Sequence, residues 1–235
     1  MLITWNEQSI GKFIEASEYT AYHKNLAAKI IPYLDKNDTM LDVGCGLGRL
    51  DLELSQHVAE ILAVDVSESA IKALQQGIEL TGAKNIRTRV SDEGEITETY
   101  DIILMSFFGR PDMSDFIKRS RRKLIRIVGA GEKSGLYPER HRRVEKNAVP
   151  GVRSELDALG VEYSLELCAI ESGQPLRTWR DAEVFVLSNA PEADADEINE
   201  FLNAHIESTG REDFPLYLPY QKELGIFVID KENRL

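Results

Sequence analysis

Long apolar runs, cysteines and basic charge are all scarce in this 235-residue sequence. No stretch reaches the roughly eighteen apolar residues that a membrane-spanning helix requires. The two cysteines, Cys45 and Cys168, are too few for a disulfide framework or a structural zinc site. Residues 1–11 lack the basic and then apolar pattern of a secretory signal. With no internal repeat and no low-complexity linker, the sequence predicts a cytoplasmic protein with one domain and no membrane contact.

Basic residues are outnumbered, with 28 Lys and Arg against 40 Asp and Glu, which gives a net charge of −12. This balance disfavours a general nucleic-acid binder. The charge is uneven, however, because residues 118–153 contain twelve Lys or Arg and three Glu, a local net charge of 12 − 3 = +9. Such a block is either a solvated face or a docking site for an anionic partner. The sequence leaves both interpretations open.

Apolar strand-like segments alternate with helical segments in the first half of the chain. Strands are expected at 39–43, 61–65, 86–90, 100–105 and 124–128, and helices at 19–33, 47–58, 67–82 and 112–123. This alternation is typical of β-α-β units and a mainly parallel sheet. After residue 129 the pattern changes. Helices are expected at 138–146, 152–159, 178–187 and 194–206, with Pro150-Gly151 as an interruption, and strands at 161–169 and 224–230.

The segment Leu41–Leu50 carries the clearest functional signal. Glycines occupy alternate positions, 44, 46 and 48, between an apolar strand and an amphipathic helix. Glycines let a ligand approach the backbone, and a helix start presents free N–H groups. The dinucleotide fingerprint G-x-G-x-x-G would place a glycine where Arg49 stands. Asp65 follows Gly44 by 65 − 44 = 21 positions and can accept hydrogen bonds from both ribose hydroxyls. The pattern therefore indicates a nucleoside site without the usual pyrophosphate turn.

These residues make the sequence resemble the class I S-adenosylmethionine-dependent methyltransferases. The first motif of that family, an acidic residue before G-x-G-x-G, matches residues 42–48, and its acidic ribose ligand matches Asp65. The residue that packs on the adenine would be Val66, and the acidic residue near the adenine amine would be Asp92. The family's fourth-strand motif matches residues 100–106. The cofactor-binding set implied by the resemblance is Asp42, Gly44, Cys45, Gly46, Gly48, Asp65, Val66, Asp92 and Ser106.

The resemblance covers about residues 39–128 and implies the fold of the whole chain. That fold is α/β, doubly wound, with a seven-stranded and mostly parallel sheet, an antiparallel last strand and helical insertions in the C-terminal half. We expect a single methyltransferase domain over residues 1–235. Residues 1–38 would form an N-terminal helical cap, 39–128 the cofactor-binding core, and 129–235 the substrate-side insertions and closing strands.

The resemblance also implies S-adenosylmethionine as the cofactor and in-line displacement at its methyl group. In such a reaction the protein mainly aligns the acceptor with the methyl group and excludes water. A general base is needed only if the acceptor must lose a proton. The sequence therefore indicates the methyl donor but contains no residue pattern that identifies the acceptor. We predict a small-molecule acceptor. Three alternatives stay open: an RNA or protein methyltransferase that docks through residues 118–153, a protein that binds S-adenosylmethionine without catalysis, and a dehydrogenase-like nucleotide binder.

No catalytic residue can be assigned from the sequence, although two candidates stand out. His23 and Tyr19 belong to the N-terminal helix, which in the family often closes over the cofactor or touches the acceptor. Both also fit the surface of an amphipathic helix. Three aromatic residues, Phe107, Phe108 and Trp179, could line an acceptor pocket or belong to the core.

Missing motifs narrow the chemistry further. The Asn/Asp-Pro-Pro-Tyr signature of amino-group methyltransferases is absent, and residues 105–108 read Met-Ser-Phe-Phe instead. No Pro-Cys dipeptide occurs, which argues against the cytosine-carbon type with its cysteine nucleophile. Residues 105–111 supply no acidic ligand of the kind that metal-dependent catechol-type enzymes use. We therefore expect no metal ion, and the sequence does not determine the oligomeric state.

Overall fold

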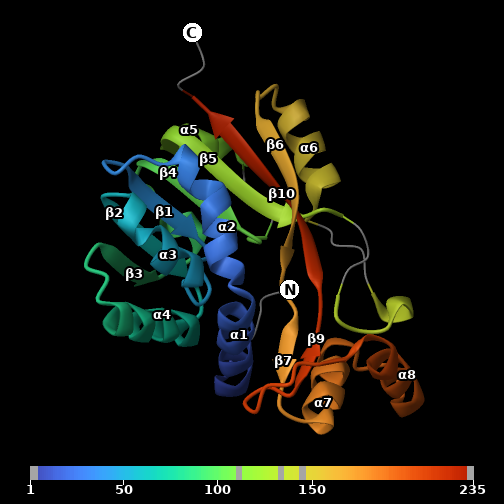
Figure 1. Cartoon of the computed structure of the whole chain (residues 1–235). Helices are drawn as coiled ribbons and strands as arrows, with labels where there is room; N and C mark the ends of the chain where they lie inside the picture. The colour runs from blue at the N-terminus through green and yellow to red at the C-terminus, as the bar shows by residue number, and fades with distance from the viewer. Residues whose placement is uncertain (1–4, 110–112, 132–134, 143–146, 232–235) are drawn as a thin grey trace.

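The computed structural model describes residues 5–109, 113–131, 135–142 and 147–231 (Figure 1). Its central sheet has seven strands in the order β3-β2-β1-β4-β5-β10-β6. The first five strands along the chain are parallel, and β10 pairs antiparallel with both β5 and β6. The predicted fold class is confirmed. The strands of this sheet are β1 (Thr39–Val43), β2 (Glu60–Asp65), β3 (Ile86–Val90), β4 (Tyr100–Ser106), β5 (Ser120–Gly129), β6 (Ser164–Glu171) and β10 (Gln221–Asp230).

Helices cover both faces of this sheet, as Figure 1 shows. Met40 of β1 belongs to the apolar core shared with α2 and α3, whereas the next residue, Leu41, belongs to the core shared with α5 and α6. Strands buried on both faces read as continuous apolar runs, which is why they could be recognised in the sequence. The helices are α1 (Glu7–Thr20), α2 (Tyr22–Ile30), α3 (Arg49–Leu54), α4 (Glu68–Thr81), α5 (Met113–Arg119), α6 (Val149–Ala158), α7 (Trp179–Asn189) and α8 (Ala195–His205).

The N-terminal helical region consists of two helices instead of the single helix predicted over residues 19–33. The first helix, α1, begins after Asn6, whose side chain accepts from the backbone N–H of Ser9 in a capping box. It ends at Ala21, which adopts a left-handed conformation with φ 53°. The chain changes direction there and continues as α2. As a result α1 contacts β7 and lies below α2 in Figure 1, beyond the end of the main sheet.

A small second sheet was not predicted from the sequence. Its strands β7 (Gln174–Leu176), β9 (Leu216–Leu218) and β8 (Glu207–Ser208) are only two or three residues long, too short to show a period. Together with α7 and α8 it encloses a core of its own, which includes Leu176, Val186, Phe201, Leu202 and Leu218. A bidentate ion pair from Arg177 to Glu15 joins this part to α1, with N···O distances of 2.6 and 3.0 Å.

Several element boundaries differ from those expected. The strand β5 begins at Ser120, where the sequence predicted the end of a helix, so α5 is shorter than expected. The helix α6 begins at Val149 and contains Pro150 in its first turn, although Pro150 was expected to interrupt it. Proline fits there because the first helical N–H groups have no partner within the helix. Of the helix expected at 138–146, the described part is a short 3₁₀ turn at Glu139–His141, and residues 143–146 lie outside the described residues.

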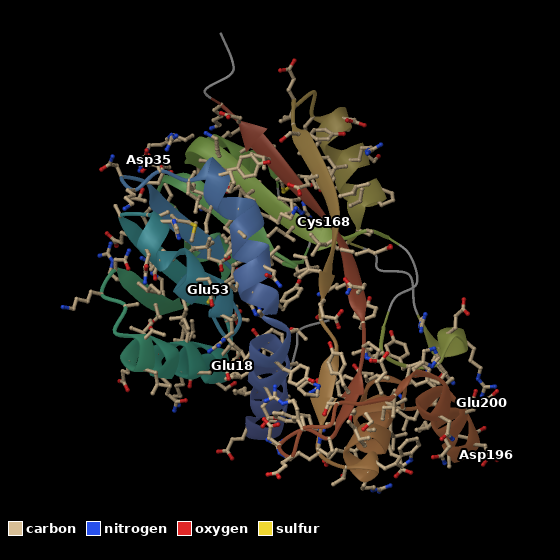
Figure 2. All side chains as sticks on the ribbon, viewed as in Figure 1. Glu18, Asp35, Glu53, Cys168, Asp196 and Glu200 are labelled. Atoms are coloured by element: carbon tan, nitrogen blue, oxygen red, sulfur yellow. The ribbon has the colours of Figure 1, made fainter. Side chains whose placement is uncertain are left out.

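The basic block at 118–153 does not gather on one element. Its described members lie on α5, on β5, on α6 and on the turn near residue 140, and most of them have acidic partners nearby. The pairs are Arg119–Asp115, Arg121–Asp101, Arg122–Asp38, Lys123–Asp230, Arg126–Glu155 and Arg140–Glu197. Exposed acids add to this local compensation, since Figure 2 shows Asp196 and Glu200 on α8, the helix that also carries Glu197. The solvated-face interpretation is favoured over a docking surface. Among the described residues, no helix combines the length and the hydropathy needed to cross a membrane.

Candidate functional site

A cavity of about 900 Å³ lies at the carboxyl ends of β1 to β4. The strand order reverses between β1 and β4, and ligands of open α/β sheets bind in the crevice at such a switch point. All nine residues of the expected cofactor-binding set line this cavity, together with the candidate His23. The nine are Asp42, Gly44, Cys45, Gly46, Gly48, Asp65, Val66, Asp92 and Ser106.

The glycine turn is tied to the end of β2 by backbone hydrogen bonds. The N–H groups of Gly44 and Cys45 both donate to the carbonyl of Val64, at 2.8 and 3.0 Å. The N–H of Gly46 donates to the Oδ2 atom of Asp65 at 2.8 Å. All three glycines have positive φ, 74°, 54° and 61° in order, a region that costs other residues about 1–2 kcal/mol. Glycine adopts this backbone conformation without that cost, so it suits all three positions of the turn.

Two of these glycines are also needed for packing, and the third faces open space. A Cβ atom at Gly44 would lie 2.2 Å from the ring of Phe108, and one at Gly48 would lie 2.3 Å from Leu74. At Gly46 the nearest atom would belong to Trp5, at 3.8 Å. The backbone at Gly46 is thus exposed to the cavity, and a ligand can come into contact with it.

Replacing Gly44 with alanine is expected to destabilise the protein by about 2–4 kcal/mol. This figure combines the left-handed backbone penalty with the cost of overpacking against Phe108. Gly82→Ala is the matched control, because Gly82 has φ 70° and a Cβ added there would have no neighbouring atom within 4 Å. Urea unfolding of both variants separates the two contributions. Equal losses of stability in Gly44→Ala and Gly82→Ala would show that the ring of Phe108 moves aside without a measurable energetic cost.

The carboxylate of Asp65 is held in place at the end of β2. Its Oδ1 atom accepts from the N–H of Ser67 and its Oδ2 atom from that of Gly46, both at 2.8 Å. A carboxylate has about four lone-pair sites, so acceptor capacity remains for a ligand. The neighbouring Val66 keeps 45% of its surface exposed at the cavity wall, an apolar surface open to a ligand. Beyond β3, exposed Asp92 also lines the cavity, and its Oδ1 atom accepts from the N–H of Gly94 at 3.0 Å.

A buried pair of carboxyl groups lies beneath the glycine turn. Asp42 lies in β1, one residue before its end, and Asp51 lies in α3. Both are buried, with Asp51 fully enclosed. Burial raises the pKa of both groups, and the negative charge of Asp42 raises that of Asp51 further. Asp51 was missed in the sequence, although one signal was present. It stands four positions after Leu47, on the apolar seam of the helix, where a charged residue is out of place.

The helix α1 and the residues before it close one side of the cavity. Its wall there includes Trp5, Phe13 and Ser17. The rings of Trp5 and Phe13 meet edge to face at 5.3 Å, and the carbonyl of Trp5 accepts from the hydroxyl of Ser69 at 3.0 Å. An ion pair from Arg49 to Glu18, which is labelled on α1 in Figure 2, joins this helix to α3 at 2.9 Å. Sequence reasoning missed this wall because residues 1–18 show no clear period.

Of the two catalytic candidates, the structure brings His23 to the cavity and places Tyr19 elsewhere. The Nδ1 atom of His23 lies 2.6 Å from the hydroxyl of Ser17, which leaves Nε2 as the second ring nitrogen. Burial and, to a smaller extent, the positive charges of Arg49 and Lys222 together lower the pKa of His23 to about 3, so the ring is neutral at physiological pH. The ring of Tyr19 instead packs on Tyr217 at 5.0 Å and on Phe214 at 5.9 Å.

The segment after β4 forms the opposite wall. Phe107 has φ 52°, a strained conformation for an aromatic residue, and its N–H donates to the carbonyl of Ile127 at 2.9 Å. The side-chain amide of Asn147 donates to the carbonyls of Phe108 and Gly109, at 2.5 and 2.6 Å. Arg126, an almost fully buried residue of β5, binds the side chain of Asn147 at 2.7 Å. These contacts hold a strained aromatic segment in one position.

Two of the three aromatic residues considered for an acceptor pocket do line the cavity. Phe107 and Phe108 are part of its wall, and the Nζ atom of Lys222 lies 3.5 Å from the centre of the Phe107 ring. Trp179 does not line the cavity. It packs against the second core, where its indole N–H donates to Asn199 at 3.3 Å. Lys222 in β10 was missed because it lies more than a hundred residues from the motifs. Among the described residues, no group of three His, Cys, Asp or Glu is placed to hold a metal ion.

The part of the chain that has this geometry matches a known family model. Residues 40–125 match the model described as a methyltransferase domain. This part of the chain is a methyltransferase domain. The matched segment contains the glycine turn, Asp65, Asp92 and Ser106, and the wall formed by α1 and Lys222 lies outside it.

Curated relatives match mainly this part of the chain. A 23S rRNA (uracil-C5)-methyltransferase of Marinomonas posidonica is 30% identical over 82 residues, which are 34% of this chain and 18% of that protein. Phosphoethanolamine N-methyltransferase 3 of Arabidopsis thaliana is 35% identical over 74 residues, 29% of this chain and 15% of that protein. The chain therefore spans less than a fifth of either relative, which leaves the acceptor of the methyltransferase domain undefined.

A solved structure supports the fold over a larger part of the chain. A methyltransferase from Aquifex aeolicus, described as S-adenosylmethionine-dependent, superposes with a TM-score of 0.52. It is 20% identical and covers 71% of this chain and 94% of its own. At this identity the likeness concerns the fold of the methyltransferase domain and does not extend to its substrate.

Proposed function

We propose that this chain transfers the methyl group of S-adenosylmethionine to a small-molecule acceptor. The observation that carries the proposal is a single cavity with two kinds of wall. One wall has the glycine turn and three carboxyl groups, and the other has aromatic rings, His23 and Lys222. Its volume of about 900 Å³ lies near the top of the range of about 300–1,000 Å³ for small-molecule sites. Such a space suits a nucleoside cofactor together with a compact second molecule.

The cofactor fits the carboxylate wall. We propose that Asp65 accepts hydrogen bonds from the ribose hydroxyls, because its carboxylate is fixed by two backbone donors and retains acceptor capacity. The exposed side of Val66 would pack on the adenine, and Asp92 would accept from the adenine amine. The open backbone at Gly46 allows close approach, and Asp42 and Cys45 complete the wall beneath it. Ser106 would lie on the path between donor and acceptor.

When bound, S-adenosylmethionine supplies an activated methyl group on a sulfonium sulfur. The protein residues then have three tasks: to orient the acceptor, to exclude water and to receive a hydrogen bond from the acceptor atom. The wall of α1 and the fixed segment after β4 would exclude water. Neutral His23, oriented through Nδ1 by Ser17, would offer Nε2 to the acceptor. In this account Ser17 is a positioning residue for His23.

A small acceptor is preferred to RNA or protein for two reasons. The aromatic wall lies inside a cavity that α1 and the ion pair between Arg49 and Glu18 cover. The described part of the basic block is distributed over several elements, and most of its residues are paired with acids. The rRNA methyltransferase and the phosphoethanolamine methyltransferase among the relatives differ in acceptor type, so they do not decide the question. A cytoplasmic location and a single domain over residues 1–235 remain predictions of the sequence.

Transfer of a labelled methyl group tests the proposed function. The full chain is incubated with [methyl-³H]S-adenosylmethionine and a cell extract that has been separated into small molecules, RNA and protein. We expect label in the small-molecule fraction and none above background in the other two. Label in RNA or protein would contradict the proposed acceptor class. Binding of the cofactor with no label in any fraction would favour a non-catalytic binding protein.

A further inference from the structure

Trp5, which precedes the N-cap residue Asn6 of α1, lies at the open side of the glycine turn. A Cβ atom added to Gly46 would be 3.8 Å from the Cζ2 atom of its indole. Apart from the chain neighbours of Gly46, no other described residue comes within 4 Å of that point. Gly44 and Gly48 are instead covered by the side chains of the core. A ligand that contacts the backbone at Gly46 therefore meets the indole of Trp5.

Two contacts from different parts of the fold hold Trp5 in this place. Its ring meets that of Phe13 in α1 edge to face, with centres 5.3 Å apart. Its carbonyl accepts from the hydroxyl of Ser69 in α4 at 3.0 Å. The hydroxyl of Ser69 in turn lies 3.0 Å from that of Ser67, whose N–H donates to Asp65. The position of Trp5 is thus linked to the loop that holds the carboxylate of Asp65.

The ring of Phe13 continues this contact towards the other side of the cavity. Its centre lies 5.5 Å from that of the His23 ring, and both side chains line the cavity. Phe13 is 38% exposed, and Trp5 is only partly buried, so neither ring is enclosed as a core residue would be. Trp5, Phe13 and His23 therefore form a row of rings with apolar surface open to the cavity. Such a surface gains free energy when a ligand covers it.

We infer that Trp5 is a cofactor-binding residue, whose indole packs on S-adenosylmethionine at the open side of Gly46. This inference rests on the proposed function and adds a binding residue from outside residues 40–125, the segment that matches the methyltransferase domain. The carboxylates at the strand ends offer polar contacts to the cofactor, and Trp5 offers an apolar surface on the opposite side. Tryptophan suits this task because its ring combines a large contact area with few rotatable bonds.

Intrinsic fluorescence tests this contact, because the chain has only two tryptophans, Trp5 and Trp179. Trp179 packs against the second core and does not line the cavity. Trp179→Phe therefore leaves Trp5 as the single emitter, and Trp5→Phe leaves Trp179. We expect S-adenosylhomocysteine to change the emission of Trp179→Phe saturably and to leave that of Trp5→Phe unchanged. No change in Trp179→Phe, or a change at least as large in Trp5→Phe, would overturn the inference.

Calorimetry measures how much the indole contributes to binding. Trp5→Ala is expected to lower the affinity for S-adenosylhomocysteine at least about tenfold, because a large aromatic contact is lost. Trp5→Phe retains a ring and should lose less, and Trp179→Phe is the matched control that should bind as the parent protein does. An unchanged affinity of Trp5→Ala would contradict the contact. If Trp5→Ala fails to fold, the fluorescence of Trp179→Phe decides.

The experiment separates the two levels of the argument. Failure of the parent protein to bind S-adenosylhomocysteine contradicts the proposed function itself. Binding with the same affinity in the parent protein and in Trp5→Ala contradicts only the role of Trp5. A lower affinity of Trp5→Ala without any fluorescence change in Trp179→Phe would assign the loss to the packing of the cavity wall and would also overturn the inference.

Discussion

Asp65→Ala is expected to lower the affinity for S-adenosylhomocysteine by about 2–4 kcal/mol, a loss of about 30-fold to 1,000-fold. The variant removes two ribose hydrogen bonds to a charged acceptor. It also leaves the N–H groups of Gly46 and Ser67 without their carboxylate partner, so the glycine turn loses one of its three hydrogen bonds to β2. Isothermal titration calorimetry at constant ionic strength measures the change directly.

Two further variants make the Asp65 result specific. Asp65→Asn keeps one acceptor oxygen and the shape of the side chain, so its loss should be smaller than that of alanine. Asp35→Ala is the control, because Asp35 is exposed just before β1, at the edge of the sheet away from the cavity (Figure 2). It should bind S-adenosylhomocysteine as the parent protein does. An unchanged affinity of Asp65→Ala would show that the ribose is held elsewhere.

The second large effect concerns the buried pair Asp42 and Asp51 and the dependence of stability on pH. Burial raises the pKa of both groups above that in the unfolded chain. Above pH about 4, the unfolded chain has released these protons and the folded protein still holds them. The free energy of unfolding therefore falls as pH rises from about 4 through the raised folded pKa values.

Asp51→Asn removes one of the two acids and is expected to be more stable than the parent protein at high pH. We expect a gain of at least about 2 kcal/mol at pH 9, because each pKa unit of displacement corresponds to about 1.4 kcal/mol. The difference should become smaller as pH falls and vanish below about pH 4, where the pair is protonated in both the folded and the unfolded state. Urea unfolding at pH 5, 7 and 9 measures it.

The difference in the free energy of unfolding between Asp51→Asn and the parent protein reports on the buried pair alone, because all other titratable groups are present in both proteins. His23, whose pKa is lowered, acts in the opposite sense, since its unfolded form gains a proton as pH falls below about 6.5, and it is present in both proteins. Asp196→Asn serves as the control because Asp196 is exposed on α8 (Figure 2). It controls for the loss of one acidic side chain at the surface. A stability gain of Asp51→Asn that is the same at all three pH values would contradict the raised pKa values of the buried pair.

The parallel core and the glycine turn could be predicted because each is encoded by residues that are close together in the sequence. Strands buried on both faces are apolar throughout, and the turn needs glycine at three alternate positions for its left-handed backbone. Asp65 and Asp92 follow strands, and the carboxyl ends of parallel strands meet at one edge of the sheet. The nine expected residues therefore line one cavity, and their location does not depend on how residues outside the parallel core fold.

The other half of the site could not be predicted because it depends on contacts between distant segments. Lys222 reaches the cavity from β10, and its neighbour Tyr22 comes from α2, two hundred positions earlier in the sequence. The break between α1 and α2 occurs at Ala21, which adopts a left-handed conformation although it is not a glycine. The sequence therefore gave no sign of the break, and a single helix was expected. Trp179 was considered for the acceptor pocket but packs against the second core. That core is defined only by the tertiary structure, so the sequence could not distinguish the two locations.

The central claim is that the cavity at the ends of β1 to β4 holds S-adenosylmethionine and not a dinucleotide. The most direct test is a calorimetric titration of the unaltered chain with S-adenosylhomocysteine, compared with a titration with NAD under the same conditions. The account predicts saturable binding of one S-adenosylhomocysteine for each chain and no measurable heat with NAD. Tighter binding of NAD, or no binding of S-adenosylhomocysteine, would contradict it.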